Sequence, residues 1–279
     1  MTAATREGQS GRICLVVAYH DEGEALSRTL ATVRLRAGDS IIVVDDGSQR
    51  LPAREFCPEQ VDGVPVTLVE LSVNEGVAAA AIAGVSAADP DIEYIARLDC
   101  RDRSTLDRFD RQRAYLDRHA TCSIVGSAVI FCDPTGAELY RHSHPESDRA
   151  IRSAMRVNCA FTQPAVMFRH DAYVSVGGYS EKYPWAEDYA LFRSLLTVGE
   201  GHNLADPLVY CSTMDGGISQ RHRRRQLMTR MKIIVHNWDW HPLSFWGLAR
   251  ATGQLATSRN FTSRVKRMLG RSDRGNPSA

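Results

Sequence analysis

The sequence predicts an α/β fold, with a doubly wound parallel sheet, helices on both faces and a helical extension at the C-terminus. Two observations predict it. Apolar, β-branched runs alternate with segments of helical periodicity through the first half of the chain, which is the order of strand–helix–strand units. Polar turns rich in Asp and Gly follow three of these runs, and parallel strands bring such turns to one edge of the sheet, where ligands bind.

The first half of the chain supplies four strands and three helices. Strands are expected at 12–19, at 40–48 (ending in a turn), at 64–71 and at 92–98, and helices at 24–37, 75–88 and 104–120. The first helix is predicted from apolar residues at helical spacing. The second is rich in alanine and is expected to be buried. Ser104 is the expected N-cap of the third.

The second half of the chain is less regular. The pattern predicts two strands joined by an Asp-Pro-x-Gly turn over 123–140, a strand, short helix and glycine break over 163–180, a helix over 185–199 and a late strand over 204–210. From 219 the pattern is basic and helical, with an aromatic cluster at 238–246. We therefore divide the chain into one domain over 1–220 and an extension over 221–279, whose last ten residues we expect to be disordered.

Composition is that of a globular protein, with 43% hydrophobic and 24% charged residues among 279. No run approaches the roughly 18 apolar residues that span a bilayer, and the polar N-terminus lacks the apolar centre of a secretory signal. The seven cysteines form no CxxC pair, which argues against a zinc cluster or a disulfide framework and favours reduced, mostly buried thiols in a cytoplasmic protein.

Charge is divided unevenly along a chain whose net charge is only +1. Residues 221–279 hold 13 of the 34 Lys and Arg and two of the 33 Asp and Glu, so this segment carries +11 and the rest −10. Such asymmetry suggests contact with an anionic surface, either phosphate-bearing ligands or lipid headgroups.

Four short motifs combine acidic residues with turn or helix-start signals. They are VVDDGS (43–48), NEGVAAAAIAG (74–84), LDCRD (98–102) and AED (186–188). Each alone has a structural explanation: a turn, a helix capped by Asn74, a loop before a helix, and acids favoured by a helix dipole.

Their order is more specific than any one motif. A strand ending in Ala-Tyr-x-Asp-Glu is followed by VVDDGS, N-x-G with a helix, RLD-x-x-D, QPAVMFR, GGYS and AEDY. This succession resembles the family 2 inverting glycosyltransferases of the GT-A fold, over roughly residues 11–226. The resemblance implies a Rossmann-like GT-A catalytic domain over 1–220, with a doubly wound mixed sheet, and leaves 221–279 as a basic, aromatic extension.

The resemblance also implies a nucleotide-sugar site. In such enzymes the first strand end, the DDGS turn, the N-x-G turn and the D-x-D region bind base, ribose and diphosphate. The matching residues here are Ala18, Tyr19, Asp45, Asp46, Asn74, Gly76, Arg97 and Asp99. Carboxylates can accept hydrogen bonds from a ribose hydroxyl or a pyrimidine N–H, and an aromatic ring such as that of Tyr19 can stack on a base.

The metal region departs from the family pattern. The family places an acid where this chain has Arg101, so Asp99 and Asp102 are the remaining candidate ligands for Mg²⁺ or Mn²⁺. One or two carboxylates suffice when phosphate oxygens and water complete the shell. Arg101 could instead offer positive charge to the diphosphate. The alternative is that both acids cap the next helix.

The AEDY match implies that Asp188 is the catalytic base, because inversion requires a carboxylate that removes the proton of the attacking hydroxyl. Glu187 beside it is expected to bind the acceptor or to orient the loop. The alternative is that both acids only cap the helix. Residues 216–226 match a late segment of the family, so Arg223 and Arg224 are candidates for the diphosphate, with a solvated basic helix face as the alternative.

The expected activity is transfer of one sugar from a UDP-, dTDP- or GDP-sugar to a hydroxyl of a glycan or lipid-linked acceptor, in cell-surface polysaccharide biosynthesis. Single transfer is favoured because the chain lacks the Q-x-x-R-W motif of processive synthases. Aromatics and bases over 227–271 suit the inner membrane surface, with packing on the domain as the alternative. A basic tail could also bind nucleic acid, but the fold gives no support for this, and no nucleic-acid partner is expected.

Two rival functions remain open. One is an inactive, glycan-binding or scaffolding relative, which the Arg101 departure allows. The other is a sugar-phosphate nucleotidyltransferase, which would need a glycine-rich, arginine-containing phosphate loop after the first strand, where this chain reads AYHDEGE.

Overall fold

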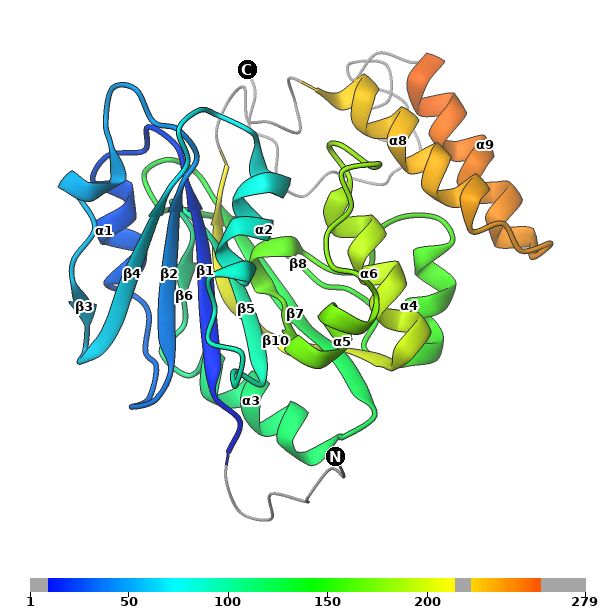
Figure 1. Ribbon diagram of the computed structural model, residues 1–279. Coiled ribbons are helices and arrows are strands. Elements are labelled where there is room, and N and C mark those ends of the chain that lie inside the picture. Colours follow the sequence, from blue (N-terminus) through cyan, green and yellow to red (C-terminus); the bar gives the residue numbers. More distant parts are fainter. Residues whose placement is uncertain (1–9, 214–221, 257–279) are drawn as a thin grey trace.

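The computed structural model describes residues 10–213 and 222–256, and a ten-stranded mixed sheet forms its centre (Figure 1). The strand order is β3-β4-β2-β1-β5-β9-β7-β10-β6, with β8 paired to β7. The strands are β1 (Ile13–Tyr19), β2 (Ser40–Asp45), β3 (Gln60–Val61), β4 (Val64–Glu70), β5 (Tyr94–Asp99), β6 (Arg103–Ser104), β7 (Cys122–Cys132), β8 (Glu138–His142), β9 (Met167–Arg169) and β10 (Glu200–Ser212).

Eight α-helices lie within the described residues. They are α1 (Ala25–Leu30), α2 (Val77–Ser86), α3 (Arg108–Arg118), α4 (Asp148–Met155), α5 (His170–Ser175), α6 (Glu187–Val198), α8 (Arg223–His236) and α9 (Pro242–Ala256). Two short 3₁₀ segments, Ala53–Glu55 and Gln163–Ala165, complete the regular structure.

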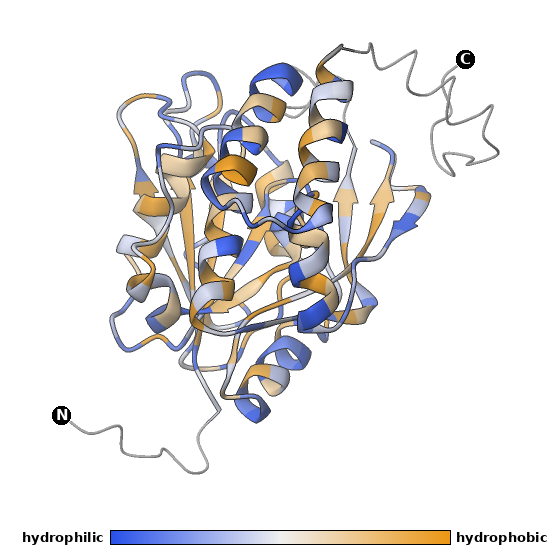
Figure 2. Cartoon of the chain, turned by 90° about the vertical axis from the view of Figure 1, so that its right-hand side faces the viewer, coloured by the Kyte–Doolittle hydropathy of each residue, from blue (hydrophilic) through white to orange (hydrophobic). Residues whose placement is uncertain are grey.

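Helices cover both faces of the sheet because side chains alternate along each strand. In β1, Cys14 and Val16 join a core cluster with α2 and α6, whereas Ile13, Leu15 and Val17 join a second cluster with α1 and α3. The strands are accordingly apolar at the centre of the molecule, and the covering helices carry polar outer faces (Figure 2). The predicted doubly wound α/β fold is confirmed.

The carboxyl ends of the central strands meet at one edge. β4, β2, β1 and β5 run parallel, and their register pairs Tyr19 with Asp45 and Ala18 with Asp99. β9 then runs antiparallel to β5 and β7, which makes the sheet mixed. The carboxyl ends of these strands therefore form the sheet edge at which we predicted the ligand site, and the residues that follow them are neighbours.

Some helix boundaries differ from the prediction. The helix expected over 24–37 ends at Leu30, where the Thr32 hydroxyl donates to the Thr29 carbonyl (2.7 Å). The Thr29 and Thr32 hydroxyls also accept from the amides of Arg101 and Ser104 (2.9 and 3.0 Å), so tertiary contacts hold this segment. α2 is only half-buried rather than buried.

The predicted helix cap at Ser104 is wrong, and so is the alternative in which Asn74 only caps a helix. Ser104 pairs with Val209 of β10 and lies in a strand, so α3 begins four residues later, after Asp107. Asn74 is exposed, and the N-cap of α2 is Gly76, whose φ of +94° suits glycine. In both cases long-range pairing or backbone geometry overrides the local cap signal.

The described part of the extension packs on the domain as an α8–α9 hairpin (Figure 1). Ile233 of α8 joins the core, and Arg156 forms an ion pair with Asp239 (2.6 Å). A side chain at Gly247 of α9 would approach the Arg156 carbonyl to 2.4 Å, so the helix lies very close to the end of α4. The disorder expected at the chain end lies outside the described residues.

All seven cysteines are free, and four of them are buried. Within the described residues, no helix is both long and apolar enough to cross a membrane.

Candidate active site

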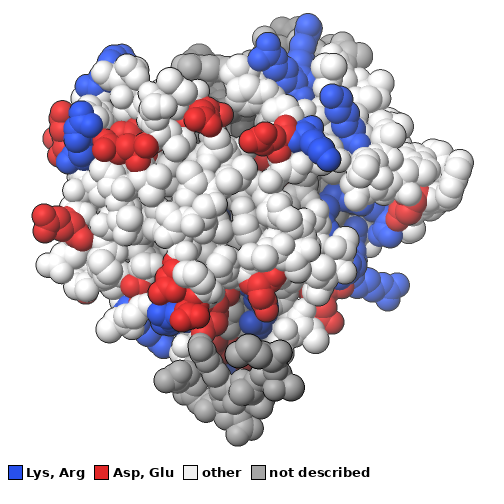
Figure 3. Space-filling model, in the orientation of Figure 1, with Lys and Arg blue, Asp and Glu red and all other residues white. Residues whose placement is uncertain are grey.

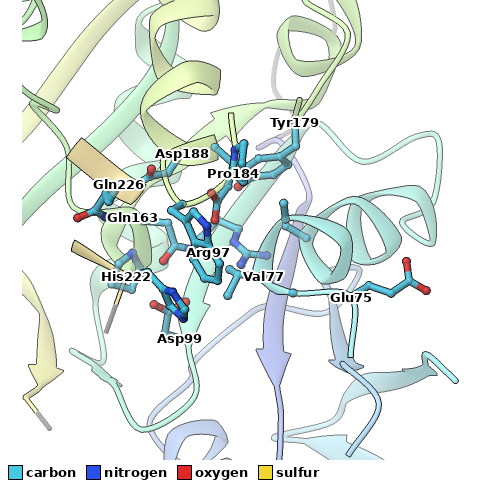
Figure 4. A pocket seen from close by; sticks show the side chains of 16 residues that line it. Glu75, Val77, Arg97, Asp99, Gln163, Tyr179, Pro184, Asp188, His222 and Gln226 are labelled. Carbon is cyan, nitrogen blue, oxygen red and sulfur yellow. The ribbon is translucent and has the colours of Figure 1, made fainter. Parts of the chain in front are cut away.

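A cavity of about 360 Å³ opens at the carboxyl edge of the sheet, between the N-termini of α2 and α6 and the start of α8 (Figure 4). Five of the residues predicted for the site line this cavity: Gly76, Arg97, Asp99, Glu187 and Asp188. They come from three elements that are far apart in sequence. The fold therefore brings the predicted donor-binding residues and the predicted base into one space.

Arg97 and Asp99 lie at the carboxyl end of β5. The side chain of Gln163, which we did not predict for the site, joins them. Arg97 is fully buried (0% exposed). With its amide oriented to suit its neighbours, Gln163 accepts from Arg97 Nε (3.0 Å) and Nη2 (3.1 Å) and donates to Asp99 Oδ2 (2.9 Å). Gln163 thus joins the buried Arg97 guanidinium and the half-buried Asp99 carboxyl group in one hydrogen-bonded row.

Asp188 and Glu187 occupy the first turn of α6. The turn before the helix is strained, because Trp185 has a φ of +70°. Trp185 itself lines the cavity. Asp188 Oδ1 accepts from the Tyr189 amide (2.7 Å). Burial raises the pKa of Asp188 above its ordinary value, and the positive charge of Arg230 on α8 opposes that shift. Burial also raises the pKa of Glu187.

Three buried polar atoms on the cavity have no hydrogen-bond partner among the described residues. They are Arg97 Nη1, Tyr179 Oη and Glu187 Oε2. Native proteins rarely leave buried polar atoms unsatisfied, because each one costs about 1–3 kcal/mol. A donor, an acceptor and a hydroxyl around one cavity match a ligand that carries several hydroxyl groups.

The predicted metal ligands are close neighbours. Asp102 is buried, its Oδ1 accepts from the Ser212 amide (2.8 Å), and burial together with the charge of Asp99 raises its pKa well above the ordinary range. Within the described residues no group of three or more His, Cys, Asp or Glu could hold a metal. Two crowded carboxylates fit a cation that takes its other ligands from phosphate and water.

The remaining predicted nucleotide contacts lie outside the lining of the cavity. Asp45 accepts from the amides of Ser48 (2.9 Å) and Ala53 (2.7 Å), and Asp46 accepts from those of Glu75 (2.7 Å) and Gly76 (3.0 Å). These carboxylates fold the loops at the edge of the sheet. Their roles in nucleotide binding, like those of Ala18 and Asn74, stay predictions.

The prediction that the Tyr19 ring stacks on a base is wrong for this conformation. Tyr19 is 2% exposed and belongs to the core cluster under α1 and α3. Its hydroxyl accepts from the Gly23 amide (2.9 Å) and donates to the Leu51 carbonyl (2.5 Å). The alternation of β1 directs this ring into the core, so its side chain is not available to a ligand.

The arginines predicted for the diphosphate do not line the cavity. Arg101 has a φ of +84°, forms an ion pair with Glu22 and lines a separate space beside α1. From α8 the cavity is lined by His222 and Gln226 rather than by Arg223 and Arg224. A diphosphate role for these three arginines remains a prediction that the geometry of the cavity does not favour. Arg221 lies outside the described residues.

Sequence reasoning did not predict several of the polar and aromatic lining residues, among them Gln163, Tyr179, Trp185, His222 and Gln226. Their segments were recognised as QPAVMFR, GGYS, AEDY and the late basic stretch, but the pattern did not indicate which side chains face the site. The Trp185 ring stacks on that of His222 at 3.9 Å, so the loop before α6 and the start of α8 close the cavity together.

Comparison with known proteins agrees with this geometry. The family described as Glycosyl transferase family 2 matches residues 14–177. The amylovoran biosynthesis glycosyltransferase AmsE of Erwinia amylovora is 29% identical over 172 residues, which cover 61% of this chain and 63% of that protein. An uncharacterized glycosyltransferase of Haemophilus influenzae is 28% identical over 202 residues, covering 71% of this chain and 73% of that protein. The chain thus spans less than two thirds of the AmsE length.

Solved structures share the fold. S. aureus TarS 1-349 in complex with UDP-GlcNAc superposes with a TM-score of 0.64 at 15% identity, covering 92% of this chain and 73% of that chain. The mannosyltransferase PcManGT from Pyrobaculum calidifontis, in complex with GDP-Man and Mn²⁺, gives a TM-score of 0.60 at 16% identity, covering 94% and 81%. The chain has the GT-A fold, and it belongs to glycosyl transferase family 2.

Proposed function

We propose that this glycosyltransferase moves one sugar, with inversion, from a nucleotide-sugar donor to a hydroxyl of a glycan or lipid-linked acceptor in cell-surface polysaccharide biosynthesis. The observation that carries the proposal is the cavity itself. Arg97, Asp99 and Asp188 line the same cavity. Buried polar atoms on its wall lack hydrogen-bond partners, and the hydroxyls of a sugar would supply them. The names of AmsE and of the TarS and PcManGT complexes support a nucleotide-sugar substrate and a polysaccharide product.

The mechanism follows from the position of Asp188 on the cavity wall. The acceptor oxygen attacks the anomeric carbon as the bond to the diphosphate oxygen breaks on the opposite side, and the acceptor proton passes to the Asp188 carboxylate. The nucleoside diphosphate leaves with the bonding electron pair. A pKa raised by burial makes this carboxylate a stronger base than an exposed one, which suits proton abstraction near neutral pH.

Asp99 and Asp102 would hold a divalent cation together with oxygens of the donor diphosphate. When bound, Mg²⁺ or Mn²⁺ would supply positive charge for the departing diphosphate. Hydrogen bonds fix both carboxyl groups: Asp102 accepts from the Ser212 amide, and Asp99 accepts from the Gln163 side chain. Glu187 faces the same cavity and offers an acceptor oxygen for a substrate hydroxyl.

Donor binding tests the proposal directly. We would titrate the full chain with UDP-, dTDP- and GDP-sugars by calorimetry, each with Mn²⁺ and with EDTA. Tight binding of one nucleotide that is lost in EDTA supports both the donor class and the metal site. Binding that survives EDTA removes the metal from the proposal. If no nucleotide sugar binds, the inactive glycan-binding alternative replaces this proposal.

Contact with the cytoplasmic face of the inner membrane is the second part of the proposal. The α8–α9 hairpin exposes Trp240 (83%), Trp246 (60%) and Phe245 around the turn between the two helices, and it exposes Arg224 and Arg225 at the start of α8. Lys and Arg side chains gather over α8 on the face shown in Figure 3. Exposed aromatics beside basic side chains suit an anionic lipid surface.

Vesicle sedimentation tests this contact. We expect binding to vesicles of phosphatidylglycerol but not of phosphatidylcholine, and at least a several-fold loss in a Trp240→Ala, Trp246→Ala double variant. Leu106→Ala is the matched control, because Leu106 is equally exposed (66%) but lies outside the extension. Equal vesicle binding by the double variant and the control would remove the hairpin from the proposal.

A further inference from the structure

Two polar side chains of α3, Arg108 and Gln112, are fully buried (0% exposed) and lie outside the lining of the cavity. Arg108 Nε donates to Gln112 Oε1 (3.0 Å), so the two side chains, one helical turn apart, form a single hydrogen-bonded unit. Polar side chains are seldom buried completely unless they bind groups that lack other partners. The groups that this pair binds therefore indicate what it does.

The pair binds both pieces of backbone that carry the hydrogen-bonded row. Arg108 Nη2 donates to the carbonyl of Arg97 itself (2.6 Å), near the end of β5. Gln112 Nε2 donates to the carbonyl of Ala165 (2.9 Å), the last residue of the 3₁₀ segment that Gln163 opens. One unit of α3 thus spans the strand end and the segment whose side chains meet at the cavity.

The 3₁₀ segment has little structure of its own to fix its position. It has only three residues, and its internal hydrogen bond from the Val166 amide to the Gln163 carbonyl is long (3.4 Å). The Val166 carbonyl accepts from the Arg97 amide (3.0 Å) and from Arg108 Nη2 (3.4 Å). The place of Gln163 relative to Arg97 therefore depends on partners outside the segment, and α3 supplies several of them.

Stability alone does not account for Arg108. Its Nη1 is buried and has no hydrogen-bond partner among the described residues. A buried donor without a partner destabilises a fold, and buried charged groups are often no more stabilising than apolar side chains of similar volume. What the guanidinium provides instead is a fixed geometry, because its planar group reaches Gln112 and the Arg97 carbonyl at the same time.

We infer that Arg108 and Gln112 are positioning residues for donor binding, which hold the end of β5 and the 3₁₀ segment in the arrangement that lets Gln163 join Arg97 to Asp99. Neither α3 side chain lines the cavity, so both act through Gln163. Members of a connected hydrogen-bond network are coupled, so the loss of one displaces the others. The inference rests on the proposed function for its binding test.

A double-mutant cycle on donor affinity tests this inference. Gln112→Met is the sharper variant, because it nearly keeps the volume of the side chain and changes no charge. It should weaken donor binding by about two- to tenfold, the effect of one lost hydrogen bond, while kcat stays near that of the wild type. In a Gln163→Ala background the same substitution should cost less than about twofold, since the side chain through which it acts is gone. Equal losses in both backgrounds overturn the inference.

Arg108→Lys repeats the cycle at the other member of the pair, and Arg113→Lys is its matched control. Arg113 is also a buried arginine of α3 (3% exposed), but its Nη2 is paired with Asp39 (2.5 Å), which precedes β2 at the amino edge of the sheet. The control should leave donor affinity unchanged even where it lowers the melting temperature. An equal loss of affinity in the control overturns the inference. If Arg108→Lys does not fold, Gln112→Met decides the outcome.

Nitrogen-15 NMR of the Gln163 side-chain amide, assigned with Gln163→Ala, gives a readout that needs no donor. Exchange of its protons with water should be several-fold faster in Gln112→Met and Arg108→Lys than in the wild-type chain, and unchanged in Arg113→Lys. Unchanged exchange in the first two variants overturns the inference. If no nucleotide sugar binds the wild-type chain, the proposed function fails, and the exchange rates still decide whether α3 positions Gln163.

Discussion

Replacing Asp188 by Asn is the sharpest test of the mechanism, because the two side chains have the same shape. The Asn oxygen can still accept from the Tyr189 amide, so the first turn of α6 should be preserved. Removing a partly desolvated carboxylate also removes a destabilising charge, so the melting temperature should stay the same or rise slightly. The variant therefore isolates the proton acceptor from the fold.

A general base contributes about 10²–10⁴ in rate, or about 2.7–5.5 kcal/mol of activation free energy at about 1.36 kcal/mol per factor of ten. We expect the lower half of that range for Asp188→Asn. Glu187 is adjacent, has an unpaired oxygen on the same cavity and a raised pKa, and so offers a second, less well-placed base. Donor affinity should hardly change, because Gln163, not Asp188, joins Arg97 and Asp99.

The assay is release of nucleoside diphosphate at saturating donor, with the donor dissociation constant measured by calorimetry. Asp171→Asn is the matched control. Asp171 lies in the first turn of α5, accepts from the next amide (2.6 Å) as Asp188 does, and is exposed outside the cavity. A rate within threefold of wild type, or a parallel loss of donor affinity, would refute the assignment of Asp188 as the base.

Three further predictions use the same site. Because burial raises the Asp188 pKa above its ordinary value of 3.8, kcat should fall with acid at a higher pH than an exposed carboxylate gives, and a limb at or below pH 4 in a pH–rate profile contradicts this. Gln163→Ala should weaken donor binding by about tenfold, because it removes the hydrogen bonds that hold the buried Arg97 and the half-buried Asp99 in place, a loss of about 1–3 kcal/mol; an unchanged donor affinity in calorimetry would count against this role of Gln163. Asp99 and Asp102 have raised pKa values, so the folded state holds their protons more tightly and loses stability as pH rises through those values. Mn²⁺ should therefore raise the melting temperature more at pH 8 than at pH 5, and Asp102→Asn should abolish most of that gain; an equal gain in the variant excludes Asp102 as a ligand.

Much of the site could be predicted because parallel strands impose a simple geometry. Once Arg97 and Asp99 are placed at the end of one central strand, and Asp188 at the start of a helix, the fold brings them to one edge. The side chains that complete the cavity could not be found in this way. Gln163 opens a 3₁₀ segment of only three residues and Tyr179 lies in a loop, and neither is long enough to show a periodicity that indicates which way a side chain points.

The long strands, their polar ends and the order of motifs could be predicted from the sequence, because alternation, turn residues and motif spacing are local properties of the chain. How individual side chains are used depends on the tertiary structure. It directs the Tyr19 ring into the core, engages Asp46 with the loop before α2, and places Gln163 between Arg97 and Asp99. These outcomes depend on contacts between residues tens of positions apart, and local pattern carries no information about which partner a polar side chain will meet.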